Sequence, residues 1–177
     1  MEAIYNIGIY FLLMFFMISS ISKIINLSHF TNIVMEYDVL PEKSVKLFGT
    51  LLPFIELLAS ISLLLDSTKI YGLMALIFLL FCFGISVIRV IKSGKKITCG
   101  CYGKFMDSKV DNLTLIKITM LMLLSIVLLM KSSSFLLEFS VFYLFMGLLV
   151  TIGVLLIQKL LSFHQETISK LNVNGVD

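Results

Sequence analysis

The residues most suited to chemistry are two cysteines one position apart, in the run Ile97-Thr98-Cys99-Gly100-Cys101-Tyr102-Gly103. A disulfide needs Cα atoms within roughly 4.4 to 6.8 Å, so Cys99 and Cys101 can bond only if the chain turns sharply between them. Gly100 permits such a turn because it lacks a side chain. The resulting ring would be small and strained, and strained disulfides are the easily reduced, catalytic kind. The spacing therefore indicates thiol–disulfide redox chemistry.

The surroundings of the cysteine pair favour redox chemistry over metal binding. Three lysines lie close by in the sequence: Lys95, Lys96 and Lys104. Their charge favours the thiolate, which is the reactive form of cysteine. Half of a metal site, or two unpaired loop thiols, are the alternatives. Zinc would need two further ligands, but the only histidines are His29 and His164, and Cys82 falls within an apolar segment. We expect no metal.

Glu56 is the second candidate, because it lies about ten residues into an apolar segment, close behind Pro53. A charged residue at mid-membrane costs roughly 2.5 to 3.5 kcal/mol on insertion scales, so this carboxyl should be paired, protonated or functional. Pro53 frees a backbone carbonyl and opens a polar notch beside it. One interpretation is a proton-linked or quinone-facing site formed with Arg89. The other is a structural carboxyl with a partner among Ser19, Ser20, Ser22, Lys23 and Arg89.

The elements that must position these residues are membrane-spanning helices. Of 177 residues, 59% are hydrophobic and 14% charged, and the mean hydropathy is +1.05. Spanning roughly 30 Å of hydrocarbon takes about 20 helical residues. Five apolar segments reach that length: Ile4–Ile25, Val45–Leu65, Ile70–Ile91, Leu113–Met130 and Phe135–Leu161. Runs such as Leu121–Leu124 do not alternate as barrel strands do. We expect an all-α, single-domain membrane bundle of residues 1–177, a four-helix core plus a C-terminal helix.

Two further features refine this prediction. The first segment lacks the basic start and small-residue cleavage site of a signal peptide, so we expect it to be retained in the fold. Gly147 and Thr151 form a small-xxx-small spacing on the fifth segment, which indicates a close helix contact.

The connections set the expected topology. Tight turns are predicted at Asp66–Lys69 and Lys131–Ser134, whereas Asn26–Ser44, with a short interfacial helix ending at Pro41, and Lys92–Asn112 are longer. Of the 14 lysines and arginines, all but Lys69 and Lys131 fall on the side of the long loops. The positive-inside rule then predicts a multi-pass protein of the cell membrane with its N-terminus outside and its C-terminus in the cytoplasm. Because basic residues cluster at segment ends, we expect membrane lipid as a partner and no nucleic acid.

The ordered motifs resemble the MauE family within the DoxX-like redox-associated membrane proteins. The matching features are Ser20–Lys23, Tyr37–Pro41, Leu52-Pro53 with Glu56, Arg89, and Cys99–Gly103, over about residues 5 to 130. The chain departs from the family at Tyr102, where phenylalanine is usual, and at Ser20, where glycine is common. The family's founding member is implicated, with a thioredoxin-like partner, in maturing the disulfide-rich subunit of methylamine dehydrogenase. The resemblance therefore implies thiol–disulfide chemistry, and not methylamine as a substrate.

Together these observations predict a membrane electron relay in which Cys99 and Cys101 are catalytic and a thioredoxin-like protein is the exchange partner. A membrane quinone near Glu56 and Arg89 is the expected second carrier. The chain would then be a component of a membrane thiol–disulfide oxidoreductase that supports disulfide formation or maturation. Two alternatives stay open. One is a non-enzymatic accessory or immunity-type protein that binds a partner, and the other is a small-solute transporter.

Overall fold

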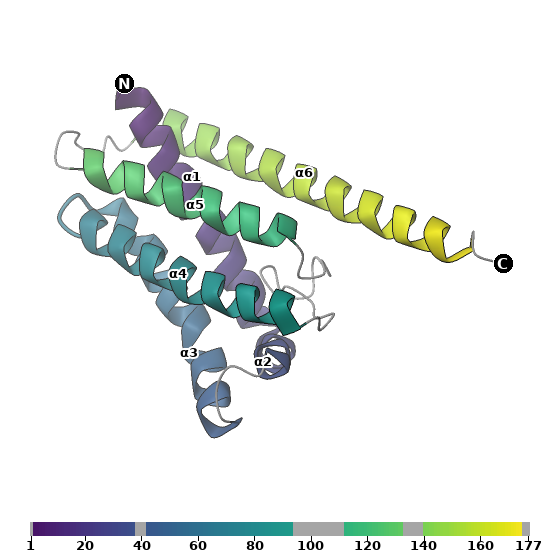
Figure 1. Ribbon diagram of the computed structural model, residues 1–177. Helices are drawn as coiled ribbons and strands as arrows, with labels where there is room; N and C mark the ends of the chain where they lie inside the picture. Colours follow the sequence, from purple (N-terminus) through teal and green to yellow (C-terminus); the bar gives the residue numbers. More distant parts are fainter. Residues whose placement is uncertain (1, 38–41, 94–111, 133–139, 175–177) are drawn as a thin grey trace.

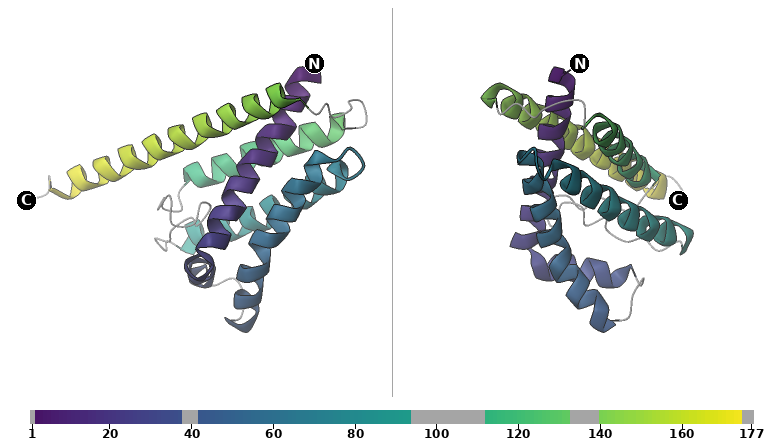
Figure 2. Two further views of the ribbon diagram at one scale, coloured as in Figure 1. Left: turned by 180° about the vertical axis from the view of Figure 1, so that it is seen from behind. Right: turned by 90° about the vertical axis from the view of Figure 1, so that its left-hand side faces the viewer.

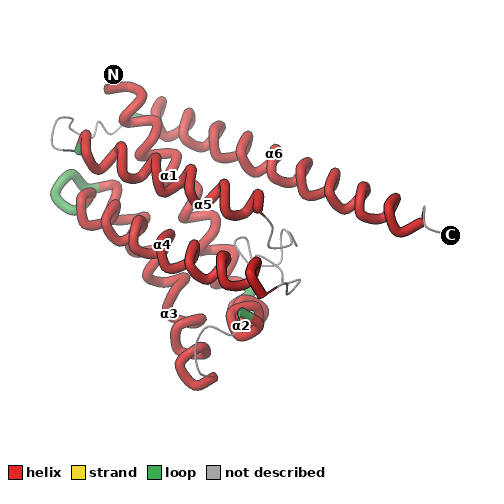
Figure 3. The backbone as a smooth tube through the Cα atoms, viewed as in Figure 1, coloured by secondary structure: helices red, strands yellow, loops and turns green. Residues whose placement is uncertain are grey.

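The computed structural model describes residues 2–37, 42–93, 112–132 and 140–174, and these residues are almost all helical, with no strand among them (Figures 1 and 3). The elements in chain order are α1 (Glu2–Ile25), α2 (Leu27–Glu36), α3 (Glu42–Ile61), the short 3-10 helix η1 (Ser62–Leu64), α4 (Lys69–Ser93), α5 (Asn112–Lys131) and α6 (Val141–Asn174). The all-α class expected from the sequence is confirmed.

Five of these helices are long and apolar enough to cross a membrane: α1, α3 with η1, α4, α5 and α6. The short α2 lies between α1 and α3, where the sequence predicts an interfacial helix. The sequence also predicts a fifth span at Phe135–Leu161, but α6 begins at Val141, directly after the non-helical Ser140, and continues to Asn174. The reason for the longer helix is that the polar residues after Leu161 include no glycine or proline before Gly175.

Helix α1 forms the centre of the bundle. Its most apolar stretch is 61% buried, against 17% to 33% for the other four spans. It packs against α2, α3, η1, α5 and α6, and its Ile9, Tyr10 and Leu12 are completely buried. The first apolar segment is therefore a part of the core, as expected for a retained helix.

The spanning helices converge at one end of the bundle and fan out toward the other (Figures 1 and 2). The converging end, which we call the closed end, carries the start of α1 and the turn from α3 to α4. At the opposite end, where α1 leads into α2, the pair α1 and α3 diverges from α4, α5 and α6. We call this second end the open end.

Small residues allow the close approach of helices toward the closed end. A Cβ atom built on Gly72 of α4 would lie 2.8 Å from the carbonyl oxygen of Ala59 on α3. One built on Gly147 of α6 would lie 2.8 Å from the backbone of Tyr10 on α1. Thr151, completely buried, donates its hydroxyl to the carbonyl of Gly147 at 2.8 Å. The close contact indicated by the Gly147–Thr151 spacing is thus made with α1.

Candidate functional site

A cavity of about 430 Å³ lies between the helices toward the open end, and all six α-helices of the described residues contribute to its wall. Much of the wall is aromatic or aliphatic, as in Phe15, Phe30, Phe48 and Phe83. Ligand cavities in proteins typically have this character, mostly apolar with a few polar groups that fix orientation. The cavity is therefore the strongest candidate for a binding site in the described part of the chain.

The cavity wall follows from helix periodicity. Residues three or four apart share one face of a helix. On α4 and α5 the lining residues recur at this spacing: Leu79, Phe83, Ser86 and Arg89 on α4, and Thr114, Lys117, Ile118 and Leu121 on α5. Each helix thus presents one inward face, which is apolar toward the closed end and carries a cation toward the open end.

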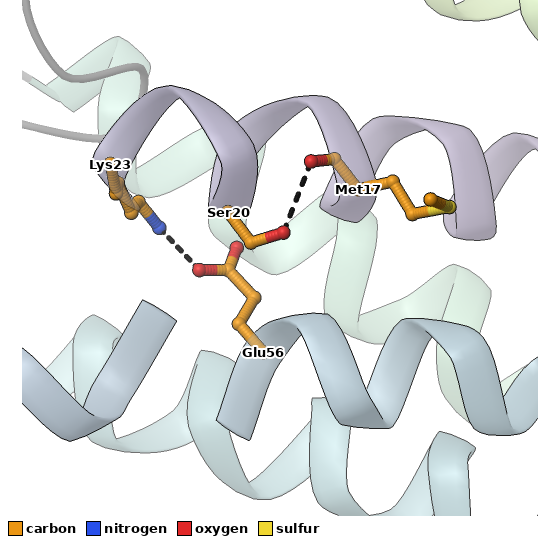
Figure 4. A network of polar contacts seen from close by, with 4 residues as sticks. All are labelled: Met17, Ser20, Lys23 and Glu56. Carbon is orange, nitrogen blue, oxygen red and sulfur yellow. Dashed lines mark hydrogen bonds and ion pairs between the residues drawn. The ribbon is translucent and has the colours of Figure 1, made fainter. Parts of the chain in front are cut away.

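An ion pair between α1 and α3 borders the cavity (Figure 4). The ammonium of Lys23 lies 2.6 Å from the Oε2 atom of Glu56, and only 10% and 5% of the two side chains are exposed. The same ammonium lies 5.4 Å from the centre of the Phe30 ring on α2, in cation–π geometry. The pair compensates the charge of Glu56 and ties α1 to α3.

The structure selects one of the structural partners considered for Glu56. Lys23 makes the pair, whereas the Ser20 hydroxyl donates to the carbonyl oxygen of Met17 at 3.0 Å (Figure 4). Arg89 lines the same cavity but forms no ion pair within the described residues. The structure thus brings Glu56 and Arg89 to one cavity, with the carboxylate bonded to a different cation.

The pairing also sets the level of Glu56 within the bundle. Lys23 lies in the last turn of α1, so Glu56 of α3 is paired with the end of α1 that leads into α2. Helix α3 extends past α1, and its Gly49 packs against Thr31 of α2. The part of α3 that precedes Pro53 therefore packs against α2 at Gly49.

Comparison with known proteins identifies the family. The sequence model of the family described as methylamine utilisation protein MauE matches residues 1–131. The chain belongs to the MauE family. No curated protein and no solved structure matches the chain. The match includes Glu56, Arg89 and the cysteine pair, and with the five apolar helices it makes this chain a multi-pass membrane protein of the MauE family.

The region matched by the family model contains most of the cavity wall. The lining residues all fall within residues 1–131 except Gln158, which lies on α6. Gln158 is 6% exposed, and its Oε1 atom has no hydrogen-bond partner among the described residues. The MauE region therefore forms most of the wall, and the C-terminal helix adds one buried amide.

Sequence reasoning missed Lys117 and Gln158 as site residues. Lys117 counted only as a topology signal, although its spacing from Thr114 and Leu121 indicates the same face. Gln158 is an uncharged polar residue next to Lys159, inside the otherwise apolar run Val154–Leu161. An isolated buried amide in such a run is the signal that could have revealed it, because buried polar groups need partners.

Cys99 and Cys101 lie outside the described residues. The segment that carries them joins Ser93, the end of α4, to Asn112, the start of α5. These two helices place Arg89 and Lys117 in the cavity wall, each within two turns of that helix end. Within the described residues, Cys82 is a free, exposed cysteine, and no group of three or more His, Cys, Asp or Glu residues could hold a metal ion.

Proposed function

We propose that this MauE-family protein is a thiol–disulfide relay of the membrane, with Cys99 and Cys101 as its redox pair and a thioredoxin-like protein as its partner. The observation that supports this most is the Cys99-Gly100-Cys101 sequence within the family match. A disulfide between cysteines one residue apart requires a sharp turn at Gly100, and the strained ring that it would close exchanges readily.

The proposed reaction is balanced between the two proteins. A thiolate of the pair attacks a sulfur of the partner's disulfide and forms a mixed disulfide, with a partner thiol released. The second cysteine then attacks the mixed disulfide, so that the relay becomes oxidised and the partner leaves as a dithiol. Two electrons and two protons pass from relay to partner, and the reverse sequence reoxidises the partner.

Positive charge on the two helices that carry the cysteine segment supports the thiolate. Lys92 lies exposed in the last turn of α4, one turn beyond Arg89, and Lys117 lies in the second turn of α5. Cations beside a thiol lower its pKa and raise the reactive fraction. The lysine bias predicts a cytoplasmic segment by the positive-inside rule, and we place the thioredoxin-like partner on that side as a part of the proposal.

Trapping of the mixed disulfide tests the proposal. Removing the resolving cysteine should halt exchange at the covalent intermediate. We expect either Cys99→Ser or Cys101→Ser, but not both equally, to accumulate a partner adduct on a non-reducing gel after acid quench and alkylation. Cys82→Ser is the matched control, because Cys82 is exposed on α4 and is expected to behave like the parent.

Mass spectrometry of the alkylated protein identifies the trapped partner and the redox state of each cysteine. A thioredoxin-fold partner bound through Cys99 or Cys101 is the expected result. If both thiols stay reduced, no adduct forms in either variant and the double serine variant keeps its cellular function, the relay is wrong. A partner-binding accessory role would then replace it.

A further inference from the structure

The cavity has an excess of positive charge. Among the described residues that line it are three cations, Lys23, Arg89 and Lys117, and one carboxylate, Glu56. Lys23 and Glu56 compensate each other at 2.6 Å, which leaves two positive charges. No carboxylate within the described residues forms an ion pair with Arg89 or Lys117. Arg89 is exposed and Lys117 is half-buried at the cavity wall. Two basic side chains without a carboxylate partner, at a cavity between membrane helices, are suited to an anion.

The rest of the wall requires that this anion carry hydrocarbon. Phenylalanines from four helices line the cavity: Phe15 and Phe16 of α1, Phe30 of α2, Phe48 of α3 and Phe83 of α4. A free inorganic anion would leave these rings facing empty or wet space. An amphiphile instead covers them with apolar chain, which is favourable by about 25 cal/mol per Å² of apolar surface removed from water.

Gln158 adds a requirement for a hydrogen-bond donor. Gln158 of α6 lines the cavity and is 6% exposed. Its Oε1 atom is buried and has no hydrogen-bond partner among the described residues. A buried acceptor without a hydrogen-bond partner is unfavourable, because it has lost its contact with water and gained none in return. A ligand hydroxyl would satisfy it, because a hydroxyl both donates and accepts and so suits either orientation of the amide.

We propose that the cavity binds an anionic phospholipid with a hydroxylated headgroup, of the phosphatidylglycerol class. Arg89 and Lys117 hold the phosphate, Gln158 accepts a hydrogen bond from a headgroup hydroxyl, and the acyl chains cover the phenylalanines. The guanidinium fork of arginine matches phosphate geometry. Basic pockets between membrane helices recognise lipid headgroups in this way, and the cavity lies toward the lysine-rich end of the bundle, where anionic lipid gathers.

A quinone fits these observations less well than an anionic lipid. Its carbonyls accept hydrogen bonds but carry no charge, so both cations would stay uncompensated. The lipid site shares Lys117 with the charge that supports the proposed thiolate, but it uses neither cysteine, and its test measures lipid binding and not disulfide exchange. Failure of one proposal therefore leaves the other unaffected.

Lipid binding to the purified full-length protein in neutral detergent tests the inference. Native mass spectrometry would measure the affinity for phosphatidylglycerol against zwitterionic phosphatidylcholine, with inorganic phosphate as a separate arm. The double variant Arg89→Gln/Lys117→Gln removes both cations. Lys92→Gln/Lys131→Gln is the matched control, because it removes two exposed cations from the same helices outside the cavity wall.

We expect the cavity variant to lose roughly 25-fold in affinity for phosphatidylglycerol, from about fivefold for each of the two cations, while the control loses little. Phosphatidylcholine, whose phosphate is compensated by its own choline cation, should bind the parent more weakly than phosphatidylglycerol and should lose much less affinity in the cavity variant. Equal binding of the two lipids by the parent, or unchanged binding in the cavity variant, would overturn the proposal. Saturation by inorganic phosphate alone would identify a free anion site, and a quinone that phosphatidylglycerol cannot displace would identify a quinone site.

A second variant tests the headgroup hydroxyl and guards against misfolding of the first. Gln158→Met keeps the side chain's length and removes its amide. The parent should prefer phosphatidylglycerol over phosphatidylmethanol, which has the same charge and no headgroup hydroxyl, by about fivefold, the value of one hydrogen bond. The variant should lose that preference and keep its binding of phosphatidylmethanol. A preference that survives in the variant, or is absent in the parent, would contradict the role of Gln158.

Discussion

The two ends of the bundle each contain a buried lysine that is paired with a carboxylate and lies over an aromatic ring. Toward the open end, Lys23 lies 2.6 Å from Glu56 and 5.4 Å from the Phe30 ring. At the closed end, Lys69 lies 2.7 Å from Asp66 and 5.6 Å from the Tyr5 ring. The pair chemistry is the same. The sequence separation differs, because Asp66 is only three residues from Lys69, whereas Glu56 is 33 residues from Lys23.

This difference shows that the two ion pairs stabilise different parts of the fold. The helices of the closed end meet through small residues and a short turn, so the Lys69–Asp66 pair only fastens a turn that the chain already forms, and the Asp66 side chain is 40% exposed. Where the helices fan out, the Lys23–Glu56 pair connects two separate helices and both groups are buried. The Lys69–Asp66 pair is local and partly reached by solvent, and we call it the wet pair. The Lys23–Glu56 pair joins residues far apart in the sequence and is buried, and we call it the dry pair.

The largest effect that we expect comes from breaking the dry pair on one side. Glu56→Gln keeps the shape of the side chain and leaves Lys23 buried without its counter-charge. The loss should be about 3 to 5 kcal/mol of unfolding free energy, as for other buried pairs with one partner removed. Because the chain has no tryptophan, the unfolding midpoint is best followed by circular dichroism at the helix band in detergent.

The double variant Lys23→Gln/Glu56→Gln is the control for that prediction. It removes both charges, so it should recover part of the loss, with a coupling between the two sites of about 0.5 to 3 kcal/mol. Additive single losses with no coupling would show that the pair does not connect α1 and α3.

At the closed end, the free energy of unfolding should depend more on added side-chain volume than on the loss of a charge. Gly72→Ala puts a methyl group 2.8 Å from the Ala59 carbonyl oxygen, and backbone there cannot yield easily. Overpacking of this kind typically costs about 1 to 3 kcal/mol. Gly84→Ala on the same helix is the matched control, because its nearest atom is a side-chain carbon of Ile118 at 3.6 Å. That change should be neutral or stabilise by up to about 1 kcal/mol, since alanine favours helix. Equal effects at both positions would refute the close packing of α3 on α4.

The sequence was sufficient for the helices and insufficient for their arrangement. Long apolar runs must form helices in lipid, because no water is present to satisfy the backbone, and this reasoning found all five spans and the short α2. The end of α6 was missed because hydropathy marks where a span leaves the membrane, and the helix continues in polar residues after Leu161. The convergence at one end depends on Gly72 and Gly147, whose contacts lie on other helices.

The site was predicted in part for a similar reason. A carboxyl within an apolar run is conspicuous, so Glu56 was found, and Arg89 followed from its place at the end of a span. The choice of Lys23 as partner depends on how α1 crosses α3, and periodicity within one helix does not contain that information. Lys117 and Gln158 became site residues only when α5 and α6 were placed around the cavity.

The smallest effect that we expect is at the wet pair, and it decides whether the comparison of the two ends holds. Asp66→Asn removes the counter-charge of Lys69 with little change in shape. Because Asp66 is well exposed, water can replace part of its contact, and exposed pairs contribute only about 0 to 1 kcal/mol, less in high salt. The Tyr5 ring also keeps its contact with the Lys69 ammonium. Unfolding measured as for Glu56→Gln, at low and high salt, should show a small loss that shrinks further as salt is added. A loss as large as that of Glu56→Gln, and insensitive to salt, would mean that burial of the lysine governs both pairs and that the partner's exposure does not distinguish the two ends.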